Sequence, residues 1–417
     1  MATEGQEELQ VRFVTKQEQY AVPDTLNAIQ GNFKTSNLNT VINGLLKESN
    51  PTFGKEVQFD FLVCGELLCS TLSEHLKKKE VSVEGTLEVE YLKKFPAPRP
   101  KDCLMHDDWI SSVHTHDNWI LSGSFDNSIH IWSTKGKSKL AIPGHTLPVK
   151  SVSWISFVGD QAAFVSVGHD ELVKLWVWDI LNNSVNCVVT GWGHDKSVEC
   201  VSVSADATKL VTGSYDTNIC LWSASLSTED DPPPKKKRKP DCDQNREPLA
   251  TWKGHREGVS SVQWMDFNTV LSSSFDHLLK LWDCELAGIK QEIAGNKAFF
   301  DANWSPLNNC IVTGSVDSHI RLYDPRSTES IVKTTFKGHT QWVVAVRWST
   351  TSGNHFLSAG YDGLVKLWDT RSPLKPLYDL SGHEDKVMCC DWSNPALLVS
   401  GSSDNTVRIF KANNSIE

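Results

Sequence analysis

The sequence predicts a seven-bladed, all-β propeller that follows a small α+β domain. Three observations lead to this fold class. One spacing of polar and aromatic residues occurs seven times after residue 100, the sequence between these marks alternates as strands do, and the first 97 residues lack the spacing. A length of 417 residues is long for one domain and sufficient for two.

The repeated spacing joins an aspartate to an aromatic residue six positions later, with a hydroxyl residue four positions before the aspartate. The aspartate and aromatic pairs are Asp126 and Trp132, Asp170 and Trp176, Asp216 and Trp222, Asp276 and Trp282, Asp317 and Tyr323, Asp362 and Trp368, and Asp404 and Phe410. The hydroxyl residues are Ser122, Ser166, Thr212, Ser272, Thr313, Ser358 and Ser400. Six repeats also have a histidine 20 to 25 positions before the aspartate, at His106, His145, His194, His255, His339 and His383.

This spacing predicts a hydrogen-bonded relay inside each blade, in which histidine, aspartate, hydroxyl and tryptophan satisfy one another. An unpaired buried polar group costs roughly 1–3 kcal/mol, so such a relay fixes a loop, a turn and two strands together. Five relays are expected to be complete. The fifth repeat has Asn296 and Tyr323 and the seventh has Phe410, so the fifth blade is expected to be the least rigid. The histidines and aspartates of the relays are interpreted as structural, not catalytic.

The pattern resembles the WD-repeat family over roughly residues 100–411, and Trp282-Asp283 and Trp368-Asp369 carry the signature dipeptide. The propeller is placed at 98–411. The resemblance implies four strands per blade, but the chain ends soon after the strand at Val407–Phe410. We therefore expect Cys103–Met105 to supply the outer strand of the last blade, which closes the ring and removes a free sheet edge.

Residues 1–97 read as a ubiquitin-like roll. A strand at 11–15 is followed by a hairpin partner at 20–22 and then by a helix, because apolar residues from Leu38 to Leu46 fall on one helical face, with Ser36 or Asn37 as the cap. Further strands are expected at 57–61, 67–69 and 87–91.

A narrower resemblance rests on Phe59-Asp60-Phe61-Leu62, Gly65-Glu66-Leu67-Leu68 and Glu88-Val89-Glu90-Tyr91, ahead of a propeller that opens with residues 106–112. These segments resemble the WD-repeat ribosome-assembly factors that act with Pescadillo and the block-of-proliferation protein. The resemblance implies a non-catalytic scaffold for ribosomal RNA processing and pre-60S assembly, in the nucleus, nucleolus and nucleoplasm. The related Notchless factors share the N-terminal domain but usually have eight repeats, whereas this chain has seven.

In these factors the ubiquitin-like domain docks on midasin, a large AAA-type ATPase, where an acidic side chain completes the coordination of a Mg²⁺ ion held by midasin. Alignment of the loop 81–85 assigns this role to Glu84, and Gly85 beside it allows a turn that presents the carboxylate. Glu66, Glu74 and Glu80 are the alternatives, and a loop glutamate is otherwise simply solvated. No cofactor of the chain's own is expected.

A polar insert at 223–250 separates the third and fourth blades and contains five consecutive cations: Lys235, Lys236, Lys237, Arg238 and Lys239. Prolines on both sides favour an extended segment outside the sheet, which suits the acidic groove of an import receptor. A solvated loop or a contact with ribosomal RNA phosphates is the alternative. The net charge of −10 argues against broad capture of nucleic acid.

Other classes of function receive little support from the sequence. There is no apolar export signal and no run long enough to span a membrane, so no membrane partner is expected. The phosphate-loop, GxSxG and HExxH motifs are missing, so the chain is not expected to be an enzyme. A substrate adaptor for ubiquitin ligation is the alternative, but that role favours a ligase-binding helical segment, and a conjugated domain would end in an exposed di-glycine.

The repeat geometry also predicts an aromatic rim for partner proteins at one end of the propeller. The residue before each turn aspartate and the residue three positions after each loop histidine should emerge together. The aromatic members are Phe125, Tyr215, Phe275, Tyr361, Trp109 and Trp342. Exposed aromatic residues are frequent hot spots of interfaces. The alternative is that these rings pack over the relays.

Overall fold

The computed structural model describes residues 8–49, 56–79, 85–226, 245–327 and 331–412. The chain divides into two compact units, Met1–Pro96 and Ala97–Glu417, and each is treated by itself.

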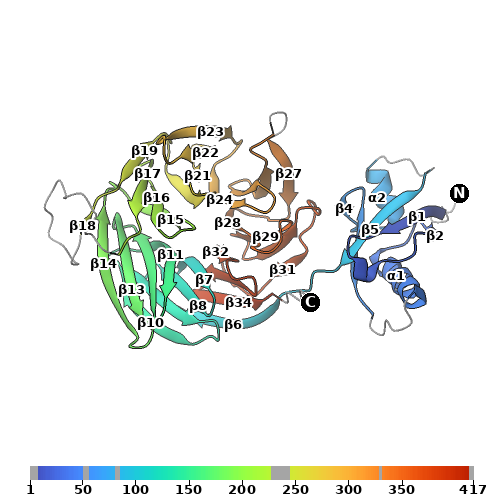
Figure 1. The fold of residues 1–417 in the computed structure, drawn as a ribbon, viewed down its shortest axis with the longest axis horizontal. Coiled ribbons are helices and arrows are strands. Elements are labelled where there is room, and N and C mark those ends of the chain that lie inside the picture. Colours follow the sequence, from blue (N-terminus) through green and yellow to red (C-terminus); the bar gives the residue numbers. More distant parts are fainter. Residues whose placement is uncertain (1–7, 50–55, 80–84, 227–244, 328–330, 413–417) are drawn as a thin grey trace. The chain divides into compact units, whose positions relative to one another are not determined.

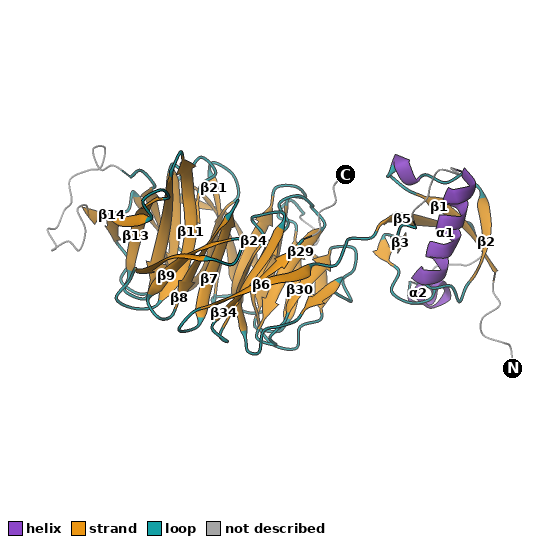
Figure 2. Cartoon of the chain, turned by 90° about the horizontal axis from the view of Figure 1, so that it is seen from below, coloured by secondary structure: helices purple, strands orange, loops and turns teal. Residues whose placement is uncertain are grey.

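The described part of the first unit is a five-stranded mixed sheet with two α-helices and one short 3-10 helix (Figures 1 and 2). Its strands are β1 (Glu8–Val14), β2 (Leu26–Gln30), β3 (Phe59–Val63), β4 (Glu66–Leu67) and β5 (Leu87–Lys93), and its helices are η1 (Glu18–Tyr20), α1 (Thr35–Ser49) and α2 (Leu72–Lys78). The strand order is β2-β1-β5-β3-β4, and β1 and β5 run parallel. Leu38 and Ile42 of α1 and Phe61 of β3 are fully buried in one core. This is the ubiquitin-like fold that the sequence predicts.

Two local predictions for this unit are wrong, and one helix was missed. The hairpin partner of β1 is β2, because η1 and Pro23 interrupt the chain and the amide of Val22 donates to the Tyr91 hydroxyl at 3.1 Å. Helix α1 begins at Thr35, so Ser36 and Asn37 lie in its first turn and neither is the N-cap residue, although the Asn37 side chain accepts the Lys34 amide at 3.2 Å. Helix α2 was not expected. It begins with a capping box, in which Thr71 and Glu74 each accept a hydrogen bond from the other's amide.

The second unit is a propeller of seven sheets (Figure 1). The first blade contains β7 (Ile110–His116), β8 (Trp119–Ser124), β9 (Ser128–Ser133) and β10 (Ser138–Pro143); the second contains β11 (Val149–Val158), β12 (Gln161–Gly168), β13 (Leu172–Asp179), β14 (Ser184–Trp192) and β18 (Asn245–Arg246). The third contains β15 (Val198–Val203), β16 (Lys209–Ser214), β17 (Asn218–Ser223) and β19 (Ala250–Lys253); the fourth contains β20 (Val259–Trp264), β21 (Thr269–Ser274), β22 (Leu278–Asp283) and β23 (Gly288–Ala294).

The fifth blade contains β24 (Phe299–Ser305), β25 (Cys310–Ser315), β26 (His319–Tyr323) and β27 (Val332–Lys337); the sixth contains β28 (Val343–Trp348), β29 (His355–Gly360), β30 (Val365–Asp369) and β31 (Tyr378–Leu380). The seventh contains β32 (Val387–Asp391), β33 (Leu397–Ser402), β34 (Thr406–Lys411) and, as its outer strand, β6 (Arg99–Met105). Met105 pairs with Thr406, so the ring closes as predicted, with a closing strand longer than Cys103–Met105.

Hydrogen bonds from one blade to the next tie the inner strands together. The Trp154 amide donates to His114 Nδ1 at 2.9 Å, and the Trp154 indole donates to the His114 carbonyl at 3.2 Å. The indoles of Trp264 and Trp348 make the same contact with the carbonyls of Ser202 and Asn303, at 3.2 and 3.0 Å. These tryptophans belong to the inner strands rather than to the relays, so the 16 tryptophans of the chain serve at least two structural purposes.

Among the described residues, no helix is both long and apolar enough to cross a membrane.

Candidate functional site

Four relays form as the sequence predicts. In blades two, three, four and six the histidine Nδ1 lies 2.8–2.9 Å from an aspartate oxygen, and its Nε2 lies 2.7 Å from the hydroxyl. The tryptophan indole donates to the same hydroxyl at 2.8 Å. Burial raises the pKa of Asp276, but the hydrogen bond to His255 and those from backbone amides outweigh it and lower the pKa to about 2.

The seventh relay lacks its last member, as expected. His383 lies 3.0 Å from Asp404 and 2.8 Å from Ser400, and Phe410 has no group to donate to that hydroxyl. The fifth blade replaces the relay with an ion pair, in which the guanidinium of Arg321 binds both carboxylate oxygens of Asp317 and also Ser315. The fifth blade was expected to be less rigid because it lacks the histidine. The ion pair between Arg321 and Asp317 holds the turn in its place, and it was not foreseen.

The first relay was predicted to be complete, and this prediction is wrong. His106 Nε2 lies 2.9 Å from Ser122, and the Trp132 indole donates to the same hydroxyl at 2.8 Å. However, His106 makes no hydrogen bond to Asp126, whose carboxylate accepts the amide of Ser128, at 2.8 Å, and its hydroxyl. Burial, with a contribution from His130, lowers the pKa of His106 to about 3.

The two sets of rim positions meet in every blade through one backbone hydrogen bond. The amide of the residue before the turn aspartate donates to a carbonyl shortly after the loop histidine, or after Asn296 in the fifth blade. The pairs are Phe125 and Trp109, His169 and Pro148, Tyr215 and Ser197, Phe275 and Gly258, Val316 and Ala298, Tyr361 and Trp342, and Ser403 and Lys386, with distances of 2.8–3.3 Å. All six aromatic residues of the expected rim therefore lie at the same end of their blades.

The rim aromatics contact one another along the ring. Tyr215 stacks on Phe275 with ring centroids 5.8 Å apart, and Trp342 lies against Tyr361 at 5.5 Å. Phe300 joins the two pairs, at 5.7 Å from Phe275 and 5.4 Å from Trp342. We call these five residues the aromatic belt. Phe300 was missed because it lies two residues beyond the rim position Ala298, at a position that the count within each repeat does not include.

The belt is partly open to solvent. Tyr215, at one end, is 42% exposed and Trp342 is 44% exposed, whereas Phe275, Phe300 and Tyr361 are half-buried. On the other side of the ring Trp109, which is 45% exposed, lies 5.8 Å from Phe125. Each ring of the belt thus packs against its neighbours, and the exposed part of each ring remains available to a partner protein.

A groove of about 590 Å³ lies beside the belt, between Trp342, Tyr361, Asp317 and Lys386. The Lys386 ammonium lies 5.4 Å from the centre of the Tyr361 ring. The Lys150 ammonium lies 5.3 Å from the centre of the Phe125 ring and also pairs with Glu199 at 3.0 Å. The rim thus combines aromatic faces with a few charges that could orient a partner.

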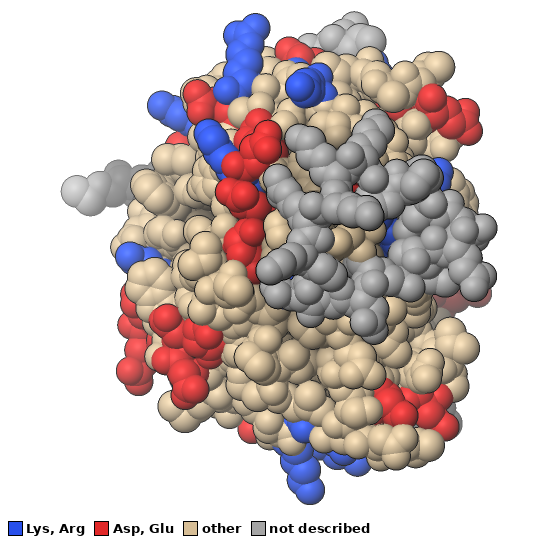
Figure 3. All heavy atoms as spheres, turned by 90° about the vertical axis from the view of Figure 1, so that its left-hand side faces the viewer, with Lys and Arg blue, Asp and Glu red and all other residues tan. Residues whose placement is uncertain are grey.

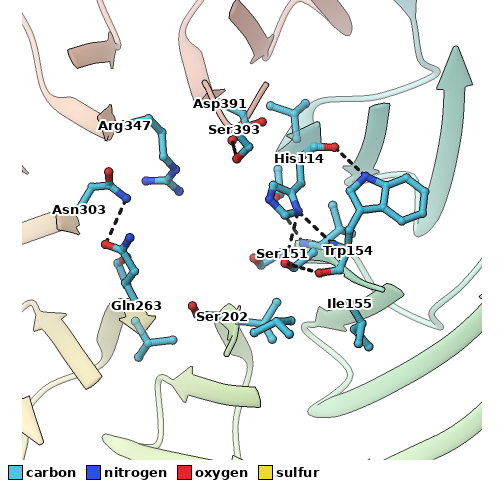
Figure 4. Close-up of a pocket in the computed structure, with 18 of the residues that line it drawn as sticks. His114, Ser151, Trp154, Ile155, Ser202, Gln263, Asn303, Arg347, Asp391 and Ser393 are labelled. Carbon is cyan, nitrogen blue, oxygen red and sulfur yellow. Dashed lines mark hydrogen bonds between the residues drawn. The ribbon is translucent and has the colours of Figure 1, made fainter. Parts of the chain in front are cut away.

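The central channel holds a second cavity, of about 280 Å³, lined by polar side chains of the inner strands (Figure 4). Arg347 and His114 project into it (Figure 4). Arg347 pairs with Asp301, and although burial opposes its charge, that carboxylate outweighs the effect and raises its pKa. Burial lowers the pKa of His114, whose Nδ1 already accepts the Trp154 amide. These groups serve to hold neighbouring blades together.

Of the other candidate residues, some lie outside the part of the chain that the structure describes and others lie within it. Glu84, Glu80 and Lys235–Lys239 lie outside the described residues. Glu66 pairs with Lys79 at 2.5 Å, and Glu74 is engaged in the capping box of α2. Both of these alternatives to Glu84 therefore already have a partner within the first unit.

The insert 223–250 does not stay wholly outside the sheet. Its last part forms β18, which pairs in parallel with β14 of the second blade. The guanidinium of Arg246 is buried and donates to the carbonyls of Ser223 and Ser225 at 3.0 and 2.7 Å. Arg246 thereby fixes the two ends of the insert to each other. On this face of the propeller some acidic side chains form a band and others form separate groups, and the described cations are scattered (Figure 3).

One cluster of the described residues has ligand types and distances suited to a metal ion, namely His106, Asp126 and His130, whose ligand atoms lie within 4.8 Å of one another.

Comparison with known proteins identifies both units. The family model described as NLE (NUC135) domain matches residues 9–76. The model described as WD domain, G-beta repeat matches seven segments, at 100–133, 136–177, 185–223, 246–283, 290–324, 330–369 and 374–411.

Curated relatives match almost the whole chain. It is 49% identical over 413 residues to the ribosome biogenesis protein WDR12 homolog of Aedes aegypti, which covers 98% of this chain and 96% of the relative. The WDR12 homolog of Anopheles gambiae is 49% identical over 413 residues, with 99% and 96% covered. That of Drosophila mojavensis is 49% identical over 409 residues, with 98% and 96% covered.

Proposed function

The chain belongs to the WDR12 family of ribosome biogenesis proteins, and we propose that it acts there as a non-catalytic scaffold in the maturation of the large ribosomal subunit. In this proposal the propeller holds Pescadillo and the block-of-proliferation protein on the pre-60S particle. The ubiquitin-like unit is the handle on which midasin pulls to release the assembly. The protein works in the nucleolus and nucleoplasm.

The observation that carries the scaffold role is the aromatic belt with its neighbouring groove. Aromatic residues that are well packed yet partly exposed lose little side-chain entropy on binding and bury a large area. In the central channel Asp391 accepts hydrogen bonds from the amide and hydroxyl of Thr115, and Asp301 accepts one from the amide of Val346, so both carboxylates are engaged in structural bonds. Both observations favour protein binding over catalysis.

Truncation of Trp342 tests the scaffold role. Trp342→Ala is expected to weaken binding to the complex of Pescadillo and the block-of-proliferation protein by about 30-fold, because a hot-spot aromatic contributes about 2 kcal/mol or more. Leu286→Ala is the matched control, since Leu286 is 82% exposed and lies beyond the opposite end of β22 from the rim. Binding is measured by titration of the purified full-length variants.

The alternative, in which the rim aromatics only pack over the relays, predicts the opposite result. If the rings serve only to pack the propeller, alanine at Tyr215, Phe275 or Tyr361 will lower the melting temperature while partner binding stays intact. Normal affinity in all of these variants and in Trp342→Ala would remove the rim from the interface.

Deletion of Lys235–Lys239 is expected to move the protein to the cytoplasm and to leave the propeller folded. The fold should survive because Arg246 and β18 fix the ends of the insert independently of its middle. Fluorescence microscopy of the tagged protein measures the distribution. Deletion of Glu229–Asp231 from the same insert is the control and should not change it. A deleted form that still concentrates in the nucleus, without a co-imported partner, would refute the import role.

A further inference from the structure

The first blade contains two buried imidazole nitrogens that have no hydrogen-bond partner among the described residues, Nδ1 of His106 and Nδ1 of His130. The two rings lie close together, with centroids 4.2 Å apart. His106 is only 6% exposed, so its free nitrogen cannot be satisfied by bulk solvent. Leaving a buried polar group unpaired is costly, and such a group in a folded protein calls for a specific explanation.

Both imidazoles are held by their other nitrogen. His106 Nε2 lies 2.9 Å from the Ser122 hydroxyl, and His130 Nε2 lies 2.9 Å from the Ser128 hydroxyl. This is the arrangement of metal-binding histidines, in which one ring nitrogen is hydrogen bonded and the other directs its lone pair at the ion. Ser128 also holds the carboxylate of Asp126, so one residue orients two of the three side chains.

The first blade differs from the other blades at one position near the relay. The residue four positions after the turn aspartate is His130 here, and elsewhere it is Lys174, Cys220, Lys280, Arg321, Lys366 and Arg408. In the blades with lysine at this position, the loop histidine binds its aspartate. Lys174 and Lys280 instead donate to the carbonyl before that histidine, at 2.9 and 2.7 Å. The loss of the histidine–aspartate bond and the presence of a second histidine therefore occur in the same blade.

We propose that His106 Nδ1, His130 Nδ1 and a carboxylate oxygen of Asp126 bind a late first-row divalent metal ion, with Zn²⁺ as the ion of choice. Two imidazoles and a carboxylate are a ligand set that Zn²⁺ commonly takes, with solvent in the fourth position. The ligand atoms lie within 4.8 Å of one another, whereas ligands of tetrahedral zinc lie about 3.3 Å apart. Binding of the ion would require side-chain rotations of the half-buried Asp126 and His130, both of which are now held by Ser128.

The position of the site gives the ion a structural role at the ring closure. His106 directly follows β6, the closing strand, and its amide donates to the Asn405 carbonyl at 2.9 Å. Asp126 and His130 lie on the β8–β9 hairpin of the first blade. A metal bound by all three would join the end of the closing strand to the first blade, and ligands that bind the folded state raise its stability by mass action.

The test titrates full-length, metal-stripped protein with Zn²⁺ in a calorimeter. The wild type is expected to bind one ion at this site and to melt at a higher temperature when Zn²⁺ is present. His130→Lys should weaken Zn²⁺ binding at least about 100-fold and abolish the rise in melting temperature. This variant should fold, because the blade architecture accommodates lysine at the equivalent positions 174, 280 and 366. Asp126→Asn is a second variant with the same expected loss.

Two controls separate this site from others. His319→Lys alters another half-buried histidine beside a turn aspartate and should leave Zn²⁺ binding unchanged. Co²⁺ used as a spectroscopic probe should show ligand-field bands without the thiolate charge-transfer band that cysteines such as the exposed Cys103 would produce. The proposal is overturned if the wild type binds no Zn²⁺, if folded His130→Lys binds it as tightly as the wild type, or if the Co²⁺ spectrum shows thiolate ligation.

Discussion

Replacement of Ser358 by alanine is expected to lower the free energy of unfolding of the propeller by about 2–4 kcal/mol. The Ser358 hydroxyl is fully buried, accepts the Trp368 indole at 2.8 Å and lies 2.7 Å from His339 Nε2. Its removal leaves two buried polar groups unpaired, each costing roughly 1–3 kcal/mol. Denaturant unfolding followed by tryptophan fluorescence measures the change. Ser184→Ala, at an exposed serine of β14, is the control and should change the stability by no more than about 0.5 kcal/mol.

A double-mutant cycle shows whether the relay acts as a unit. Trp368→Phe removes the indole donor, so after Ser358→Ala this second change should cost less than it does in the wild type. A coupling free energy of about 1 kcal/mol or more is expected for groups in one hydrogen-bonded network. Additive effects would mean that each member acts alone, and the relay would then be no more than a set of separate contacts.

The propeller could be predicted because the repeated spacing is a direct record of its geometry. A turn aspartate, a hydroxyl on the strand before it and a tryptophan on the strand after it come together only when the two strands pair in one register. In the sixth blade this register brings the Trp368 indole to the Ser358 hydroxyl. The first blade carries the same residue types, yet its relay is broken. What distinguishes the first blade is His130, which lies at a position to which the motif assigns no residue type.

The missed elements are short and carry little periodicity. Helix α2 has seven residues with two buried leucines, too few to establish a helical pattern, although the sequence Thr71-x-x-Glu74 was a usable start signal. Strand β18 has two residues, and its pairing with β14 depends on chain segments that are distant in sequence. Of the candidate site, the rim positions followed from counting within each repeat, whereas Phe300 lies two residues beyond the rim position Ala298, where the other repeats have no aromatic residue.

Substitution of Glu84 is expected to abolish the binding of midasin without unfolding the protein. In the proposed handle, one carboxylate completes the coordination of the Mg²⁺ ion of midasin, and loss of a charged partner at such a contact costs about 2–5 kcal/mol, or at least ~30-fold in affinity. Glu84→Ala removes the ligand, Glu84→Asp shortens it and Glu84→Gln removes its charge, so all three should fail. The variants should still enter the complex with Pescadillo and stall large-subunit precursors dominantly.

The ubiquitin-like unit supplies its own matched controls for Glu84. Glu66 is paired with Lys79, so Glu66→Ala should leave midasin binding unchanged. The loss of this partly exposed ion pair should lower the stability of the unit by at most about 1 kcal/mol. Glu74→Ala should cost about 1 kcal/mol through the cap of α2 and leave binding intact. If Glu66→Ala or Glu80→Ala abolishes binding and Glu84→Ala does not, the handle exists with a different ligand. If none of these variants affects binding, the metal-bridged handle must be abandoned, because Glu84 and each of the alternatives to it will have been tested.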